Sequence, residues 1–328
     1  MRNFAVSGQK TPLMSGIGHA ARLRFGGGAA GIERMEAALV GTAFEPHRHD
    51  TYAIGVTLAG VQTFRYRGEQ RHCLPGQWHV LHPDEPHDGA AGTELGFGYR
   101  ILYLDPALVQ DALGGRPLPF VADPVIRPAR VGAAVANWLR HIDDPLDDVE
   151  AAEITASVAD LLRAHGTDPV RGRAALDLDA VRRVRALLRD DFAHPHRAAD
   201  LERVSGLDRW SLARQFRAAF GTSPTRFRTM RQLDAARRSL GAGVPPAEVA
   251  AAVGFADQSH LTRMFKRAYG VTPAAWTAAV RGGAARVGPV PGGSAAGPDR
   301  VHHAGHVLTA AAERDGLAEQ RVADVQQR

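Results

Sequence analysis

The sequence predicts an α+β protein of two domains, in which a small β-barrel followed by helices precedes an all-helical domain. Three observations predict this fold class. Between residues 31 and 105, short apolar runs alternate with turns rich in Gly and Pro, which is typical of strands. Beyond residue 105 the apolar residues recur at helical spacing. A stretch of the C-terminal half is repeated 49 residues later, which indicates two copies of one supersecondary unit.

The strand-like runs and the helical runs follow one another without mixing. Strands are expected at 32–40, 52–58, 61–66, 78–81 and 98–104, and helices at 106–113, 130–142 and 147–165. Many short strands at close spacing favour a sandwich or barrel. The helices that follow either cover this barrel or form a dimer surface, and the sequence leaves both open.

Charge is unevenly distributed along the 328 residues. Residues 177–281 contain 18 basic and 10 acidic side chains, which gives +8, whereas residues 1–176 contain 17 basic and 20 acidic, which gives −3. A concentration of positive charge in the repeated segment indicates a polyanionic partner for it. The prevalence of Arg over Lys is explained most simply by a GC-rich coding bias.

Composition also predicts a compartment. Cys73 is the single cysteine and has no intramolecular partner, which fits a reducing cytoplasm. The N-terminus lacks the apolar core of a signal peptide, and no run approaches the roughly 18 apolar residues that span a bilayer. We therefore expect a soluble, cytoplasmic protein.

Histidines and aromatic residues gather in the barrel region. They admit three interpretations: ligands of a divalent metal, ordinary loop or core residues, or the polar walls of a small-molecule pocket at the barrel mouth. The third is favoured, and the expected effector-binding residues are His47, His49, Tyr52, Trp78, His82 and His87. By strand alternation, His79 should face away from this pocket, and Arg48 and Asp50 should be solvated.

The same region resembles the cupin jelly roll. The resemblance rests on Gly41-x5-His47-x-His49, on Pro75-Gly76 and on Pro83-x-x-Pro86-His87. In metal-binding cupins the first motif continues to a Glu, but here the stretch reads Asp50-Thr51-Tyr52-Ala53-Ile54. Because this carboxylate is missing, we predict no metal, no cofactor and no enzymatic activity.

The repeated segment has the layout of two helix-turn-helix units. In the first, a helix at 198–204, a turn around Gly206 and a helix at 208–220 follow a helix at 178–192. A long helix at 224–240 leads to the second unit, with helices at 246–253 and 257–269 around Gly254. Apolar residues at helical spacing are expected to form the core of each unit: Leu212, Phe216, Phe220, Leu261, Phe265 and Tyr269.

The remaining faces of the two second helices carry residues suited to DNA. Arg214 and Arg263 match guanine and Gln258 matches adenine, whereas Arg217 and Lys266 are expected to meet phosphate. A charged face that is merely solvated would explain one such helix. It is a poor explanation for two basic helices that recur at the same positions of the repeated segment. The predicted DNA-binding residues are Arg209, Trp210, Ala213, Arg214, Arg217, Gln258, Ser259, His260, Thr262, Arg263 and Lys266.

This segment, about 178–276, resembles the bipartite DNA-binding domain of the AraC/XylS family of bacterial transcription regulators. The stretch 250–266, continuing to Gly270-Val271-Thr272-Pro273, carries the resemblance, and 206–224 is its first-unit counterpart. The resemblance implies that both second helices enter successive major-groove faces, with base contacts at Trp210, Ala213, Arg214, Gln258, Ser259, His260, Thr262 and Arg263. Since Ala213 is short, the first unit should read fewer bases. Trp276 stands where the family often has Tyr-Arg.

The family often carries a cupin-like effector domain ahead of its DNA-binding part, as expected here. The sequence therefore predicts a regulator, by family resemblance an activator, that binds operator DNA and a small effector; RNA polymerase and a second copy are further expected partners. The alternatives are a metal-dependent cupin enzyme fused to a DNA-binding module and an effector-independent DNA binder. The expected organisation is an arm at 1–30, the effector domain at 31–166, a linker at 167–176, the DNA-binding domain at 177–280 and a mostly disordered tail at 281–328.

Overall fold

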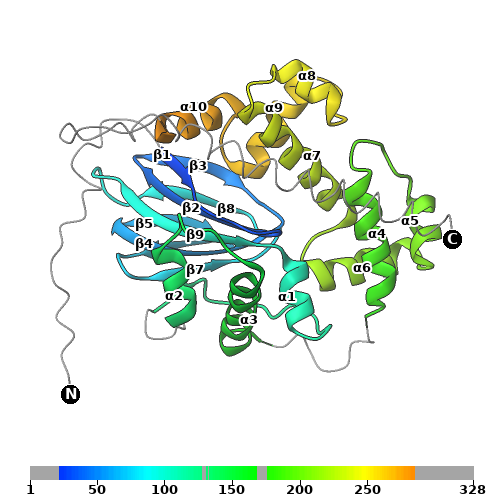
Figure 1. The fold of residues 1–328 in the computed structure, drawn as a ribbon, viewed down its shortest axis with the longest axis horizontal. Helices are drawn as coiled ribbons and strands as arrows, with labels where there is room; N and C mark the ends of the chain where they lie inside the picture. The colour runs from blue at the N-terminus through cyan, green and yellow to red at the C-terminus, as the bar shows by residue number, and fades with distance from the viewer. Residues whose placement is uncertain (1–21, 128–130, 132, 168–175, 285–328) are drawn as a thin grey trace, which may run out of the picture. The chain divides into compact units, whose positions relative to one another are not determined.

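The computed structural model describes residues 22–127, 131, 133–167 and 176–284. Its N-terminal part contains two antiparallel sheets, as expected for the barrel (Figure 1). The six-stranded sheet has the order β1-β2-β9-β4-β7-β10 and the four-stranded sheet the order β3-β8-β5-β6. The strands are β1 (Arg22–Phe25), β2 (Ile32–Leu39), β3 (Thr42–His47), β4 (Tyr52–Gly60), β5 (Gln62–Tyr66), β6 (Glu69–Cys73), β7 (Trp78–Leu81), β8 (His87–Ala91), β9 (Phe97–Leu104) and β10 (Val125–Ile126).

The sequence missed the strands with little apolar content or little length. Strand β1 falls within the expected arm, yet it pairs with β2 along its four residues. Strand β6 is mostly exposed, so its alternation of apolar and polar residues is weak. Strand β3 contains Pro46 and pairs irregularly with β8. Edge strands tolerate Pro and exposed polar residues, which explains why these segments lack a strand-like pattern in the sequence.

Helices α1 (Pro106–Ala112), α2 (Ala133–Arg140) and α3 (Asp148–His165) pack against one face of the six-stranded sheet. Their shared core contains Ile54, Val80 and Leu102 of the sheet and Ile154 and Val158 of α3. Helix α3 begins with a capping box between Asp147 and Glu150, at the start expected from the sequence. These helices therefore cover the barrel, which was one of their two expected roles. The other role, a dimer surface, stays a prediction.

The C-terminal part is helical throughout the residues described. Its helices are α4 (Leu178–Asp190), α5 (Ala198–Ser205), α6 (Arg209–Phe220), α7 (Pro224–Gly241), α8 (Pro246–Ala252), α9 (Gln258–Tyr269) and α10 (Pro273–Ala284). Gly206 and Gly254, in the two turns, have positive φ values of 74° and 81°. Helix α10 was not predicted. The expected linker and tail lie almost entirely outside the described residues.

The two helix-turn-helix units have different core partners. In the first, Leu212, Phe216 and Phe220 pack with Val181 and Val184 of α4. In the second, Leu261 and Phe265 belong to a core that also contains Leu23 and Met35 of the barrel. The predicted core faces of both helices are thus confirmed, and the second unit shares its core with the barrel.

No helix in the described ranges is long and apolar enough to cross a membrane.

Candidate functional site

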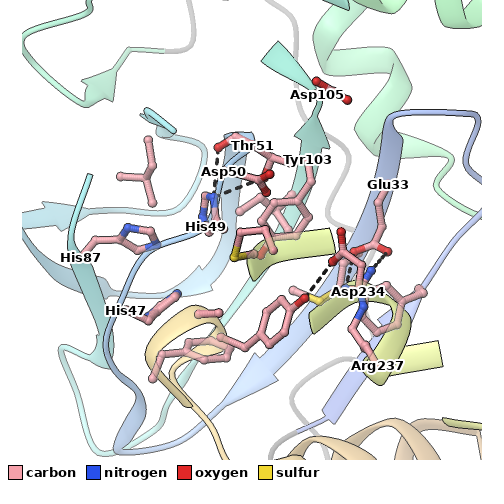
Figure 2. Close-up of a pocket in the computed structure, with 18 of the residues that line it drawn as sticks. Glu33, His47, His49, Asp50, Thr51, His87, Tyr103, Asp105, Asp234 and Arg237 are labelled. Carbon is pink, nitrogen blue, oxygen red and sulfur yellow. Dashed lines mark hydrogen bonds and ion pairs between the residues drawn. The ribbon is translucent and has the colours of Figure 1, made fainter. Parts of the chain in front are cut away.

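A cavity of about 330 Å³ is bounded by the inner faces of the barrel sheets and by helices α7, α9 and α10. The barrel contributes apolar walls, among them Leu23, Met35 and Phe64, and the helices contribute Met230 and Trp276. Charged groups and imidazoles also reach it. In Figure 2, His47, His49 and His87 lie on one side of the cavity, whereas Glu33, Asp234 and Arg237 lie on the other.

Three of the predicted effector-binding residues are brought together at this cavity. His47 of β3 and His87 of β8 are paired across neighbouring strands, with ring centroids 4.3 Å apart. His49, just beyond β3, lies 4.9 Å from His87 by the same measure. Each Nδ1 is within hydrogen-bond distance of a backbone carbonyl two residues away: Glu45 at 2.8 Å, Thr51 at 3.0 Å and Glu85 at 2.9 Å.

The environment of these imidazoles favours their neutral form. Burial, with a smaller contribution from His87, lowers the pKa of His49 to about 3. Burial also lowers the pKa of His87, and burial together with the two other imidazoles lowers the pKa of His47 well below its ordinary value. At neutral pH the cluster is therefore uncharged.

The other three predicted effector residues do not line this cavity. Tyr52 and Trp78 belong to the core under α1–α3, on the opposite face of the six-stranded sheet. His82 stacks on Phe120 with centroids 4.5 Å apart and accepts a hydrogen bond of 3.0 Å from the Val121 amide. Because both faces of this sheet are buried, apolar alternation could not indicate which face was the interior.

Trp78 was expected to line the cavity and His79 to face away from it, but the structure shows the reverse. The two do alternate across β7, as expected, but His79 is the one that lines the cavity. Gly55 makes room for it, since a Cβ there would lie 2.3 Å from the His79 Cε1. Its side chain is fully buried, and neither ring nitrogen has a hydrogen-bond partner in the structure.

Ion pairs from helix α7 line the far side of the cavity. Arg237 binds both carboxylate oxygens of Glu33, at 3.0 and 2.7 Å. Arg231 pairs with Asp50 at 2.7 Å and with Asp234 at 3.1 Å. Asp50 was expected to be solvated, and this was wrong: it is 5% exposed because Arg231 compensates its charge. Arg231 and Arg237 were missed in the sequence, where the available signal was the spacing of three residues that separates each of them from Asp234.

The residues described contain no group of three or more His, Cys, Asp or Glu side chains that could hold a metal ion. Asp50, which follows the His-x-His pair, is engaged by Arg231.

Capping side chains define where the two second helices begin. Asp208 accepts hydrogen bonds from the amides of Trp210 and Ser211 at the start of α6, and Asp257 accepts one from His260 at the start of α9. Gly221 and Gly270, both with φ near +70°, end these helices. The sequence therefore determines both ends of each helix locally.

Most of the predicted DNA-binding side chains are accessible. Trp210 is 72% exposed, an unusual place for an indole. His260 is partly covered by an edge-to-face contact with Phe255, and Arg214 donates to the Ser211 hydroxyl at 3.0 Å. The exposed members are Arg209, Trp210, Ala213, Arg214, Arg217, Gln258, Ser259 and Arg263, and the partly exposed ones are His260, Thr262 and Lys266.

The two expected phosphate-binding residues face carboxylates of the barrel. Lys266 of α9 lies 2.7 Å from Glu45 of β3, and Arg217 of α6 lies 3.6 Å from Asp84. Asp84 is buried and also lies 3.5 Å from Arg226, at the start of α7. The helical units are thus joined to the barrel partly through groups suited to DNA phosphates.

Sequence families match the two halves separately. The model of the AraC-like ligand binding domain matches residues 29–163, and a helix-turn-helix domain model matches residues 201–279. An uncharacterized HTH-type transcriptional regulator of Bacillus subtilis, YbfI, is 25% identical over 66% of this chain and 81% of its own. A putative AraC-like transcription regulator of Streptomyces antibioticus is 32% identical over 43% of this chain and 48% of its own.

Solved structures of ToxT from Vibrio cholerae have a similar fold. The form bound to an unsaturated fatty acid is 13% identical, covers 78% of this chain and 98% of its own, and has a TM-score of 0.56. ToxT bound to (E)-4-(8-methylnaphthalen-1-yl)but-3-enoic acid is also 13% identical, over 78% of this chain and 97% of its own, with a TM-score of 0.51. At this identity the likeness shows the fold alone.

Proposed function

This chain is a transcription regulator of the AraC family, with an N-terminal effector-binding domain and a helix-turn-helix DNA-binding domain, and we propose that its effector occupies the cavity shared by the barrel and helices α7, α9 and α10. One observation carries this proposal. The walls of the cavity come from both parts, so that a molecule inside it contacts β-strands and DNA-binding helices together. The effector-contacting residues in this proposal include His47, His49, His79 and His87.

Because the cavity walls come from both parts of the protein, effector binding should change DNA binding in a predictable direction. A ligand that contacts both walls stabilises the arrangement in which α9 and β3 are in contact, because it binds that arrangement better than one in which they separate. In this arrangement Glu45 neutralises Lys266, and Asp84 faces Arg217. Effector binding should therefore weaken DNA binding, and its loss should release both cations for phosphate contacts.

The DNA-reading residues are proposed to be those on the exposed faces of α6 and α9. The first helix offers chiefly Trp210 and Arg214, with Arg209 and Arg217 for the backbone. The second offers Gln258, Ser259, His260, Thr262 and Arg263 for bases and Lys266 for phosphate. Because the second set has more groups that can form hydrogen bonds with base edges, it should supply most of the sequence specificity.

Finer features of the function rest on the family resemblance. We propose that the protein activates transcription in the cytoplasm by contacting RNA polymerase, that it acts as a homodimer, and that it catalyses no reaction. Light scattering of the full chain tests the dimer. Transcription from a template carrying its binding site, with purified RNA polymerase, tests activation.

The central proposal is tested by combining a ligand screen with DNA binding. Full-length protein is screened for metabolites that raise its melting temperature, and each hit is added to a titration of DNA selected in vitro for binding. The expected result is a several-fold loss of DNA affinity with a ligand whose binding is weakened by Phe64→Ala in the cavity wall. Hits that leave DNA affinity unchanged would contradict the proposal.

A further inference from the structure

The imidazole cluster at the cavity specifies the chemistry of the ligand's polar group. His47, His49 and His87 each have Nδ1 against a backbone carbonyl oxygen, at 2.8, 3.0 and 2.9 Å. A carbonyl oxygen can only accept a hydrogen bond, so the Nδ1 of His47 and the Nδ1 of His87 must carry a proton. The His49 Nδ1 also lies 3.2 Å from the Thr51 hydroxyl, but its shorter contact is with the Thr51 carbonyl, which assigns the proton to Nδ1 in the same way. In a neutral imidazole the other nitrogen, Nε2, is then an unprotonated acceptor. The cluster therefore presents three acceptors and no donor.

Another imidazole lies deeper in the barrel, and in its neutral form it offers one acceptor and one N–H donor. His79 is fully buried and lines the same cavity, and its two ring nitrogens have no partner in the structure. An unpaired buried polar group destabilises the protein, and a ligand with a matching group relieves that penalty. Among the buried side chains that line the cavity, this one most needs a partner from a ligand.

An anionic polar group does not fit this side of the cavity. Its lone pairs would face the Nε2 lone pairs, and the less exposed arginines that line the cavity are already paired: Arg185 with Asp105, Arg231 with Asp50 and Asp234, and Arg237 with Glu33. Arg238, for which the described residues show no ion pair, is exposed. In solvent such a cation binds a carboxylate weakly.

A cationic polar group is also disfavoured beside the imidazoles. The positive charge of Arg226 contributes to the lowered pKa values of His47 and His49, and it would act on a bound ammonium in the same direction. An ammonium would also have to compete for its partner, which is costly for a buried charge. The carboxylates that line the cavity are already engaged: Glu33, Asp50, Asp105 and Asp234 with arginines, and Asp88 with the Arg65 amide. The polar group that remains is an uncharged one with O–H or N–H donors.

Between the imidazoles and the ion pairs of helix α7, apolar side chains form much of the cavity wall. Leu23, Met35 and Phe64 come from the barrel, Ile101 from β9 and Met230 from α7. A cavity of about 330 Å³ has room for a ligand of roughly ten to twenty heavy atoms. Such walls accommodate a hydrocarbon or aromatic body rather than one that is polar on all sides.

We propose that the effector is an uncharged amphipathic molecule whose hydroxyl groups donate hydrogen bonds to His47, His49 and His87, and whose apolar body lies between the barrel and α7. This inference rests on the proposed function, since it concerns the same cavity. It also separates this chain from ToxT, whose bound ligands in the structures compared are acids.

The cluster is next to the helix that reads DNA. A Cβ on Gly270, at the end of α9, would lie 2.8 Å from the His47 Nδ1, and the Glu45 amide donates to the Gly270 carbonyl at 3.1 Å. A hydroxyl bound at His47 is thus separated from the end of α9 only by the His47 side chain. This proximity gives the polar group, and not only the body of the ligand, an influence on DNA binding.

The test uses three probes that share one hydrocarbon chain: octane-1,2-diol, octanoate and octylamine. Their binding to the full-length protein is measured by calorimetry at neutral pH. We expect the diol to bind at least about tenfold more tightly than either charged probe, because octanoate offers no donor to the acceptors and octylammonium, which does, would bury its charge. His49→Leu should abolish this preference by weakening the diol selectively. His72→Leu, at an exposed position outside the cavity, is the matched control.

Three outcomes would overturn the inference. One is binding of octanoate or octylamine as tight as that of the diol, and another is no binding by any of the three probes. The third is stoichiometric uptake of Zn²⁺ that His49→Leu removes, because the Nε2 lone pairs would then be metal ligands. If octanoate bound and weakened DNA binding, the headgroup inference would fail while the proposed function survived. The comparison of probes on the unaltered protein needs no variant to fold.

Discussion

Lys266 of the second DNA-binding helix and Glu45 of strand β3 form an ion pair with Nζ and Oε1 2.7 Å apart. The lysine side chain remains 41% exposed and the glutamate 56% exposed, so the pair is screened by solvent. A pair of this kind is worth about 0.2–1 kcal/mol, enough to shift a finely balanced equilibrium and too little to fix it. The same lysine is the expected phosphate contact of α9, so one cation serves two competing partners.

Glu45→Gln should strengthen DNA binding about two- to fivefold, because Lys266 loses its competitor for phosphate. The slope of log affinity against log salt concentration should become steeper by roughly 0.9, which is the contribution of one phosphate contact. Fluorescence anisotropy across a salt series measures both. Glu69→Gln, which removes the partner of Arg71 on β6, is the matched control and should change neither. An unchanged affinity for Glu45→Gln would argue that the pair has no part in regulation.

Arg263→Ala and Lys266→Ala should affect DNA binding in different ways. Loss of a guanidinium that reads a base should cost about 1–3 kcal/mol on the preferred sequence and relax selectivity at one position. Loss of a phosphate contact should weaken binding evenly and reduce the salt slope by about one. Titrations with matched and single-mismatch sites separate the two. Equal behaviour of both variants on all sites would show that the faces of α9 are assigned incorrectly.

Gly270→Ala and Gly206→Ala compare two helix-terminal glycines with nearly the same backbone. Their φ values are 70° and 74°, so alanine costs each roughly 1–2 kcal/mol of backbone strain. A Cβ at 206 meets nothing within 4 Å, whereas one at 270 lies 2.9 Å from both the Glu45 carbonyl oxygen and the Phe44 Cβ. Only Gly270→Ala should therefore separate α9 from β3. Faster proteolysis between the domains and tighter DNA binding for this variant alone would be the readout.

Stability should fall as the solution is acidified below about pH 6.5. Burial lowers the pKa of His79 to about 3 and of His82 to about 4, whereas an unfolded chain titrates near 6.5. Between these values the unfolded state binds protons that the folded state does not, so the free energy of unfolding decreases with decreasing pH. Each buried imidazole contributes up to about 1.4 kcal/mol per pH unit in that window.

Urea unfolding from pH 7.5 to 5.0 measures this slope. His82→Gln keeps an acceptor for the Val121 amide and removes the titrating ring, so it should flatten the dependence. His72→Gln, at an exposed position, should leave the dependence as it is. A wild-type stability that stayed constant to pH 5 would contradict the neutral, buried state of these histidines.

The fold class was predictable because each half has its own periodicity. The helices at 208–220 and 257–269 were predicted to within one residue, because Asp208, Gly221 and Asp257 act on their own helix. His47, His49 and His87 stood out as well, since polar rings are uncommon among strand residues.

Other parts of the site depend on tertiary contacts that no local pattern records. The burial of Asp50 requires Arg231, which lies 181 residues further along the chain. The inward orientation of His79 and the outward orientation of Trp78 depend on α1–α3 covering the opposite face of the sheet. When both faces of a strand are apolar, its sequence is equally compatible with either orientation.

The core that the second helix-turn-helix unit shares with the barrel has an evolutionary consequence. Leu261 and Phe265 pack in one cluster with Leu23 and Met35, whereas the first unit packs in a cluster of its own. Substitutions in the shared cluster alter thermal robustness and the response to the effector at the same time. The core of the first DNA-reading unit can therefore drift more independently, whereas the second can change its core only through variants that the barrel tolerates.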